Sequence, residues 1–357
     1  MRFMVFLTAV VRAVDAHADL LRTSIAHAGN DHRLGANEAP PAIISIYLGE
    51  QLTEIVENLV AGTTPSGDRR KTTMTLGVTT LPPLPRDATD RNRTSPFAFT
   101  GNKFEFRAVG AGQSIATPNI ALNVIAADSL KVLADEIEKA RKTAGLEAAV
   151  QQVVQATLKK HQRIIFNGNN YAPQWHQEAE RRGLLNLRNT VDAIPHLASD
   201  KNVALFETFN VLSRREVESR SHIMYESYCK AIAIEAQSCL GLAQTAVLPA
   251  ALKFQERLAM NLAALRSFSV GADRAQEKLL KTVTDRVNAL VSETEGLQEA
   301  FDRSEAHHDG LKEHALICRD QVIPAMQKVR EACDALELVV DDGLWPLPKY
   351  REMLFIH

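Results

Sequence analysis

Helical spacing of apolar residues dominates the chain after residue 128 and restricts it to a mainly helical fold. The clearest case is two stretches joined by a polar turn at residues 303–310. The stripe positions of the first stretch are Leu280, Val283, Val287, Leu290, Thr294, Leu297 and Phe301. Those of the second are Leu311, Ala315, Cys318, Val322, Ala325, Val329, Ala332, Leu336 and Val339. Steps of three and four residues place each set on one helix face, which predicts a long antiparallel helical hairpin over residues 280–339 with coiled-coil-like packing.

The residues between 128 and 265 also read as helices separated by short turns. The pattern predicts helix over 128–166 with one break near Gly145, a turn at 167–173, and short helices to residue 211. Ser213 and Glu216 have the spacing of a capping box, which opens a helix that reaches residue 265 and bends at Pro249. The irregular apolar end at 345–350 is expected to dock on the helices.

Residues 1–127 mix helix, loop and strand. The patterns predict a helix over 3–28 that stops at Gly29, and a second helix over 43–60 that ends at Gly62. A basic surface loop is expected at 63–73. A strand is expected over 97–106, broken by Gly101 and Asn102. The predicted fold class is therefore α+β and predominantly helical, with one domain at 1–127 and an all-helical region at 128–357.

The first 28 residues admit two interpretations. One positive charge and an apolar run at 1–11 have the outline of a secretory signal. A helix of the core explains the whole segment, because its apolar and charged residues separate onto two faces. The apolar set is Phe3, Phe6, Val10, Val14, Leu21 and Ile25, and the charged set is Arg12, Asp15, Asp19 and Arg22. We adopt the helix, predict no membrane-spanning segment because no run of about 18 apolar residues occurs, and expect a cytoplasmic location.

Composition excludes some classes of function. The formal net charge is −2 and 45% of residues are apolar, which argues against a nucleic-acid-binding protein. The four cysteines stand singly in helical patterns, so we predict buried free thiols of a reducing compartment. His307, His308 and His314 lie in or just after the polar turn, where we interpret them as turn residues rather than metal ligands.

Two short stretches carry the candidate chemistry. In a strand over 103–107, Lys103, Glu105 and Arg107 share one face, and a carboxylate between two cations stays ionised, as a metal ligand must. The alternative is a solvent-facing strand whose charges compensate one another.

The loops nearby leave similar alternatives open. Arg91 and Arg93 in their loop offer donors to a carboxylate or phosphate, or are plain surface charges. Arg33 and Glu38 lie in a loop punctuated by glycine and proline, which suits a lid over a small charged substrate or an ordinary connector.

These stretches resemble a known family. Residues 30–41, NDHRLGANEAPP, look like the flap region of type III glutamine synthetases, and residues 91–108, RNRTSPFAFTGNKFEFRA, are similar to that family's Asn-Arg-(Ser/Thr) stretch and the strand after it. Weaker similarity covers nearly the whole chain. The resemblance implies an enzyme that joins glutamate and ammonia with ATP through γ-glutamyl phosphate, with Mg²⁺ or Mn²⁺, in a homo-oligomer of stacked hexameric rings.

The resemblance also implies roles for six residues. Glu38 would close the site and help to deprotonate ammonium, and Arg93 would stabilise the transferring phosphoryl group. Arg33 and Arg107 would hold glutamate. Lys103 would approach the nucleotide phosphates, and Glu105 would bind the metal.

Some of the family's features have no counterpart here. A second arginine that the shorter forms place after Asn-Arg-Ser is absent, since residues 95–98 read SPFA. The upstream β-grasp domain, further metal carboxylates, a metal-binding histidine and much of the nucleotide pocket are also missing. The resemblance therefore implies a C-terminal portion, begun at an internal methionine or cut by a broken reading frame, that is inactive alone. Residues 1–127 would be the end of the catalytic domain, and residues 128–357 the helical region of the type III form. The alternative function is a helical scaffold or interaction protein that uses the 280–339 hairpin.

Overall fold

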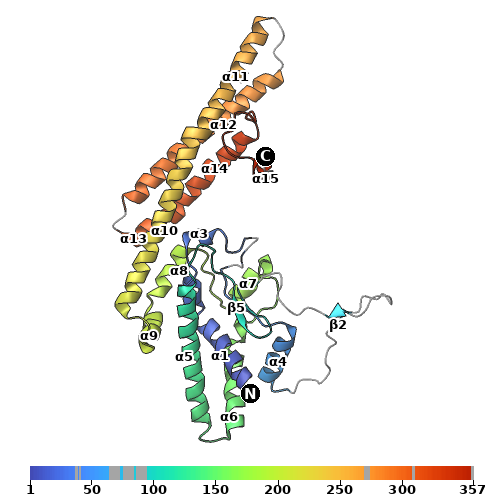
Figure 1. The fold of residues 1–357 in the computed structure, drawn as a ribbon, viewed down its shortest axis with the longest axis vertical. Coiled ribbons are helices and arrows are strands. Elements are labelled where there is room, and N and C mark those ends of the chain that lie inside the picture. The colour runs from blue at the N-terminus through green and yellow to red at the C-terminus, as the bar shows by residue number, and fades with distance from the viewer. Residues whose placement is uncertain are drawn as a thin grey trace. The chain divides into compact units, whose positions relative to one another are not determined.

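The chain forms two compact units, residues 1–224 and residues 225–357, in a computed structural model (Figure 1). The structure describes residues 1–36, 39, 42–63, 73–74, 84–85, 95–268, 274–307 and 310–354. Glu38, Arg93 and most of the predicted basic loop at 63–73 lie outside the described residues. The assignment of residues 1–127 to a catalytic domain, and of 128–357 to a separate helical region, stays a prediction.

The N-terminal segment is helical, but the prediction of one continuous helix over 3–28 was wrong. It forms α1 (Arg2–Ala16), α2 (Ala18–Thr23) and α3 (Ala28–Asp31). The chain leaves helical geometry at His17, where φ is −126°, and the His17 imidazole lies 3.0 Å from a carboxylate oxygen of Asp128. A contact distant in sequence therefore accompanies a break that periodicity does not signal.

The charged residues that the sequence places on one face of the first helix form ion pairs inside the first unit. The pairs are Arg12 with Asp128 at 2.8 Å, Asp15 with Arg163 at 2.9 Å, Asp19 with Lys201 at 2.6 Å, and Arg22 with Asp31 at 3.7 Å. Each charge has an opposite partner, and such pairing is what makes burial of charge tolerable. The expected apolar face is only partly buried, since Phe3 and Phe6 are exposed.

A small sheet follows. Its strands are β1 (Ile46–Tyr47), β4 (Phe97–Phe99) and β5 (Phe104–Phe106), in the order β1-β4-β5. β1 pairs parallel to β4, and β4 pairs antiparallel to β5. The strand expected over 97–106 with a break at Gly101 is confirmed, because Gly101 has φ +94° in the turn. A separate antiparallel pair is β2 (Thr73–Met74) with β3 (Leu84–Pro85).

The second predicted helix begins later than its pattern suggests. α4 spans Glu50–Ala61 and ends at Gly62, which has φ +71°, so the predicted end is confirmed. Its predicted start at residue 43 was wrong. The chain at Ile46 is a strand whose carbonyl accepts a hydrogen bond from the Phe166 amide at 2.8 Å, so pairing across the fold overrides the local helical spacing.

Helices cover this sheet and complete the first unit. They are α5 (Ala116–Ala140), α6 (Leu146–His161), a 3₁₀ turn (Gln162–Ile164), α7 (Pro173–Arg181), α8 (Thr190–Leu197) and α9 (Asp200–Thr208). The predicted break near Gly145 is confirmed, although α5 starts well before Asp128. α1 packs on both α5 and α6, and apolar residues from these helices and from β1 and β4 form one core (Figure 1).

The later helices are long. α10 (Arg214–Leu242) leads through a π-helical stretch (Ala243–Val247) into α11 (Leu248–Ser267). α12 (Arg274–Glu305) precedes α13 (Leu311–Ile317), which continues through a second π-helical stretch (Cys318–Val322) into α14 (Ile323–Glu337), and α15 spans Tyr350–Leu354. The capping box is confirmed, since the Ser213 amide donates to Glu216 Oε2 at 2.8 Å.

Each π-helical stretch ends two residues before a proline. Pro249 and Pro324 lie in the first turn after each stretch. Proline lacks an amide hydrogen and its ring crowds the carbonyl four residues back, so a wider turn at that point lets the helix continue. Near the bend predicted at Pro249, the structure therefore has a change of hydrogen-bonding pattern, and the bend itself stays a prediction.

The stripe positions predicted for residues 280–339 lie inside the second unit. α12 packs along α11 and α14 (Figure 1). Val283, Leu290 and Leu297 on α12 are buried, as are Val329 and Leu336 on α14. Trp345 in the irregular end is buried as well, so that segment docks as expected.

Among the described residues, one helix meets a length and composition test for crossing a membrane. It is the continuous run Arg214–Ser267, whose most apolar window is 28% buried. The sequence-based expectation of no spanning segment rested on uninterrupted apolar runs and did not detect this helix. The same test is passed by core helices of soluble proteins, so it does not assign a membrane location.

Candidate functional site

The two stretches singled out in the sequence are joined by hydrogen bonds. The Asn30 side-chain amide donates to the carbonyl of Ile25 and to the carbonyl of Ala108, each at 3.0 Å. Arg33 Nη2 donates to the carbonyl of Val109 at 3.0 Å. Residues 30–33 are therefore fixed against the segment that follows β5, and this brings the Arg33 guanidinium close to the chain next to Arg107.

The charged face of β5 is arranged around Glu105. Thr100 Oγ1 donates to Glu105 Oε1 at 3.2 Å, and Lys103 Nζ lies 3.5 Å from the same oxygen. Arg107 donates to Glu105 Oε2 at 3.2 Å through Nη2. Burial alone would raise the pKa of Glu105, but the hydrogen bonds from Arg107 and Thr100 outweigh it and hold that pKa below its usual value. Glu105 is therefore an ionised carboxylate with 38% of its side chain exposed.

Phenylalanines hold the opposite face of this strand. The rings of Phe97 and Phe104 are stacked with centroids 5.2 Å apart, and Phe97 also meets Phe106 at 6.0 Å. The alternation predicted for residues 103–107 is thus present. The alternation places the three charged side chains on one face because the phenylalanine side chains pack in the core on the other.

Arg33 has a donor that the described residues do not use. Its Nη1 atom is buried and has no hydrogen-bond partner within the described part of the chain. A buried guanidinium nitrogen without an acceptor is costly, so this atom suits an anionic ligand. Arg107 is also mostly buried, and its side chain is oriented by Glu105.

Asp31, which precedes Arg33 by two residues, is held by Thr190 and Arg22. Asp31 accepts hydrogen bonds from the Thr190 amide and hydroxyl, both at 2.8 Å, and lies 3.7 Å from Arg22. Burial raises the pKa of Asp31 and lowers the pKa of Arg22. Sequence reasoning missed Asn30 and Asp31, because their partners at 108 and 190 are distant and nothing local signals them.

The fit of Glu105 to a divalent metal is partial. Its two oxygens could supply one ligand, but Mg²⁺ and Mn²⁺ need several oxygen ligands. Within the described ranges, Glu105 belongs to no group of three potential metal ligands. These residues do not by themselves form the metal centre that the resemblance implies.

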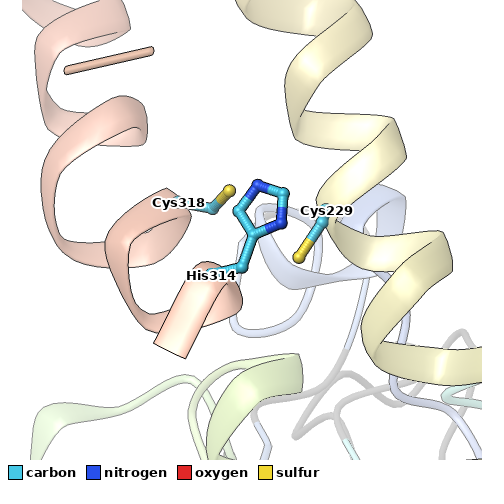
Figure 2. A group of neighbouring side chains, drawn as sticks. All are labelled: Cys229, His314 and Cys318. Atoms are coloured by element: carbon cyan, nitrogen blue, oxygen red, sulfur yellow. The ribbon is translucent and has the colours of Figure 1, made fainter. Parts of the chain in front are cut away.

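A different group of potential ligands was missed by the sequence analysis. Cys229, His314 and Cys318 lie together in the second unit (Figure 2). His314, interpreted from the sequence as a polar residue in or just after the turn, is 6% exposed and lies within α13. The signal available was the spacing of four residues between His314 and Cys318.

The sequence was compared with known protein families and with curated proteins. Residues 149–266 match the model of the family described as the glutamine synthetase C-terminal domain. The chain is 45% identical over 365 residues to the type-3 glutamine synthetase of Dictyostelium discoideum, covering 99% of this chain and 49% of that protein. It is 38% identical to a glutamine synthetase of Bacteroides fragilis, with 99% and 50% covered.

Over nearly its whole length, then, the chain is related to glutamine synthetases, and within them to the type-3 form. It spans about half the length of the curated relatives that it matches. This confirms the family named from the residues at 30–41 and 91–108, and a C-terminal portion fits the coverage.

Proposed function

We propose that the chain serves as a C-terminal portion of a type-3 glutamine synthetase, in the ATP-dependent ligation of ammonia to glutamate through γ-glutamyl phosphate. The observation that carries the proposal is the hydrogen-bonded junction between residues 30–33 and residues 108–109, which gathers Arg33, Glu105 and Arg107 in one region. Glutamate is a dicarboxylate, and guanidinium groups match carboxylates in geometry and charge.

The proposed roles follow the chemistry of each group. Arg33 and Arg107 hold substrate glutamate, and the buried unpartnered Nη1 of Arg33 supports its part. Lys103 is mostly exposed and is proposed to approach the nucleotide phosphates. Glu105 is proposed to give one ligand to Mg²⁺ or Mn²⁺.

Glu38 and Arg93 complete the proposed site. Both lie outside the described residues, and their roles in site closure and in stabilising the phosphoryl group rest on the resemblance. Assembly into stacked hexameric rings and a cytoplasmic location are also proposals.

The chain by itself is proposed to be inactive. One carboxylate cannot assemble the several ligands that a catalytic Mg²⁺ site needs. The test uses purified chain with glutamate, ammonia and Mg-ATP, and measures glutamine. Glutamine formed by the chain alone would contradict inactivity.

A hybrid tests the function itself. The corresponding half of the Dictyostelium discoideum enzyme is replaced by this chain, and glutamine synthesis is expected to return. In that hybrid, Arg33→Lys and Arg107→Lys should each raise KM for glutamate by about tenfold or more, because lysine cannot make a bidentate contact with a carboxylate. Arg215→Lys, at an exposed arginine, is the matched control. An inactive but folded hybrid, or unchanged KM in both variants, would overturn the proposal.

The alternative is a helical interaction protein that uses the 280–339 hairpin as a docking surface. Leu338 at the end of α14 is 82% exposed, which favours some contact there. Recovery of synthetase activity in the hybrid decides for the enzyme.

A further inference from the structure

Three side chains with metal-binding atoms converge inside the second unit (Figure 2). Cys229 comes from α10, His314 from α13, and Cys318 from the start of the second π-helical stretch. All three are buried, and one potential ligand atom of each lies within 4.8 Å of those of the other two. None of the residues proposed to bind glutamate, nucleotide or Mg²⁺ belongs to this group.

Helix geometry explains why two of these ligands meet. His314 and Cys318 are four residues apart in a continuous helical stretch, so their side chains project from one face. The third ligand reaches that face from α10. The Cys229 and Cys318 thiols are close enough to hydrogen-bond to one another.

A carboxylate lies near the His314 ring. Its Nε2 lies 3.6 Å from Glu305 Oε1 at the end of α12. Histidine ligands commonly donate the N–H that does not bind metal to a carboxylate, which fixes the tautomer and the ring orientation. If Nε2 donates to Glu305 in this way, Nδ1 is the ring nitrogen that binds the metal.

The spacing suits zinc. Tetrahedral Zn²⁺ has Zn–S bonds of about 2.3 Å and Zn–N bonds of about 2.0–2.1 Å, so its ligand atoms stand about 3.5–3.8 Å apart. The three ligand atoms lie within 4.8 Å, and a closure of about 1 Å by side-chain rotation satisfies that geometry.

We propose that Cys229, His314 and Cys318 bind one Zn²⁺ ion through two thiolates and one imidazole, with Glu305 orienting the imidazole and water completing the tetrahedron. Two sulfur ligands and one nitrogen select zinc over the oxygen-preferring Mg²⁺ and Mn²⁺ of the proposed catalytic reaction. Binding releases the two thiol protons to solvent and changes no oxidation state. The ion joins α10 to α13 and stabilises the second unit.

The test is a titration of the full chain with Co²⁺, a coloured substitute for Zn²⁺, in reducing buffer. One equivalent should produce a thiolate-to-cobalt charge-transfer band and the intense visible bands of tetrahedral Co²⁺, and added Zn²⁺ should bleach both. Cys229→Ser and Cys318→Ser should lose the charge-transfer intensity. Glu305→Gln should weaken affinity by about 10–100-fold, as loss of an outer partner does.

The chain supplies its own control. Cys239 and Cys333 are a second pair of neighbouring thiols in the same unit, with no histidine grouped with them within the described residues. The double variant Cys239→Ser with Cys333→Ser should retain the full cobalt spectrum. Loss of the spectrum in that control, or a wild-type chain that gives no thiolate band, would overturn the proposal.

Protection of thiols tests the proposal without any substitution, in case a cysteine variant does not fold. With Zn²⁺ present, alkylation followed by peptide mapping should show Cys229 and Cys318 modified at least about tenfold more slowly than without it. Cys239 and Cys333 should react at the same rate in both conditions. Equal protection of all four, or a Cys229–Cys318 disulfide that forms in reducing buffer and excludes Zn²⁺, would contradict zinc binding.

Discussion

Replacement of Asn30 tests the junction that supports the candidate site. Asn30 is 1% exposed, and its amide donates to the carbonyls of Ile25 and Ala108. In Asn30→Ala both carbonyls lose their donor within a buried environment. The segment that carries Arg33 then loses its hydrogen bond to Ala108 and keeps the bond from Arg33 to Val109.

The cost can be worked out from these contacts. Loss of each hydrogen bond costs about 1 kcal/mol of unfolding free energy, and each buried carbonyl left without a donor costs about 1 kcal/mol more. Asn30 Oδ1 is itself buried without a partner among the described residues, which destabilises the wild-type fold. Removal of this atom in Asn30→Ala therefore offsets part of the loss. We expect the first unit to lose about 2–4 kcal/mol of unfolding free energy, a large share of a typical domain's stability.

Urea unfolding followed by circular dichroism measures this loss. Asn123→Ala is the matched control, because Asn123 is exposed and donates only to the Asn119 carbonyl in its own helix, so its change should stay within about 0.5 kcal/mol. Asn30→Asp should be worse than Asn30→Ala at neutral pH, since it sets a carboxylate against two carbonyl oxygens. It should improve on acidification, when protonation restores a donor. Equal stability of Asn30→Ala and Asn123→Ala would refute the reasoning.

Three further results are expected from urea unfolding of the first unit. Gly62→Ala should cost about 1 kcal/mol, because Gly62 ends α4 at φ +71°, while Gly112→Ala should be neutral. Burial favours a raised pKa at Asp128, but the hydrogen bonds it accepts prevail and lower that pKa. Burial lowers the pKa of His17. Both groups therefore stabilise the fold at neutral pH. The contribution of His17 is lost as the pH falls below 6.5, and that of Asp128 as it falls below 3.8. In Asp128→Asn, the unfolding free energy should therefore depend less on pH in the acidic range. Trp175→Ala should cost about 3–5 kcal/mol, because the ring is fully buried and stacked at 3.8 Å on an aromatic partner.

Local patterns predicted the features whose causes are local. The capping box at Ser213, the helix end at Gly62 and the broken strand around Gly101 each depend on residues only a few positions apart, and all three are present. The alternation of Lys103, Glu105 and Arg107 belongs to the same group. It arises from the period of a strand and gave half of the candidate site, together with the family resemblance.

The errors share one cause, which is partners far away in the chain. His17 interrupts the first helix where it meets Asp128, 111 residues away, and Ile46 joins a strand instead of a helix because it pairs with Phe97 and Phe166. Helical periodicity separates the charged from the apolar residues of α1 and α2 but does not show what packs on either face.

The sequence by itself therefore determined the helical character, the caps and turns, the charged face of one strand and the family. Only the tertiary structure decided which charges are buried, where helix gives way to strand, and that Cys229 lies beside His314 and Cys318. Periodicity and capping act over a few residues and can be read along the chain. Pairing of Asp15 with His161, 146 residues apart, depends on how whole helices pack, and no local pattern records it.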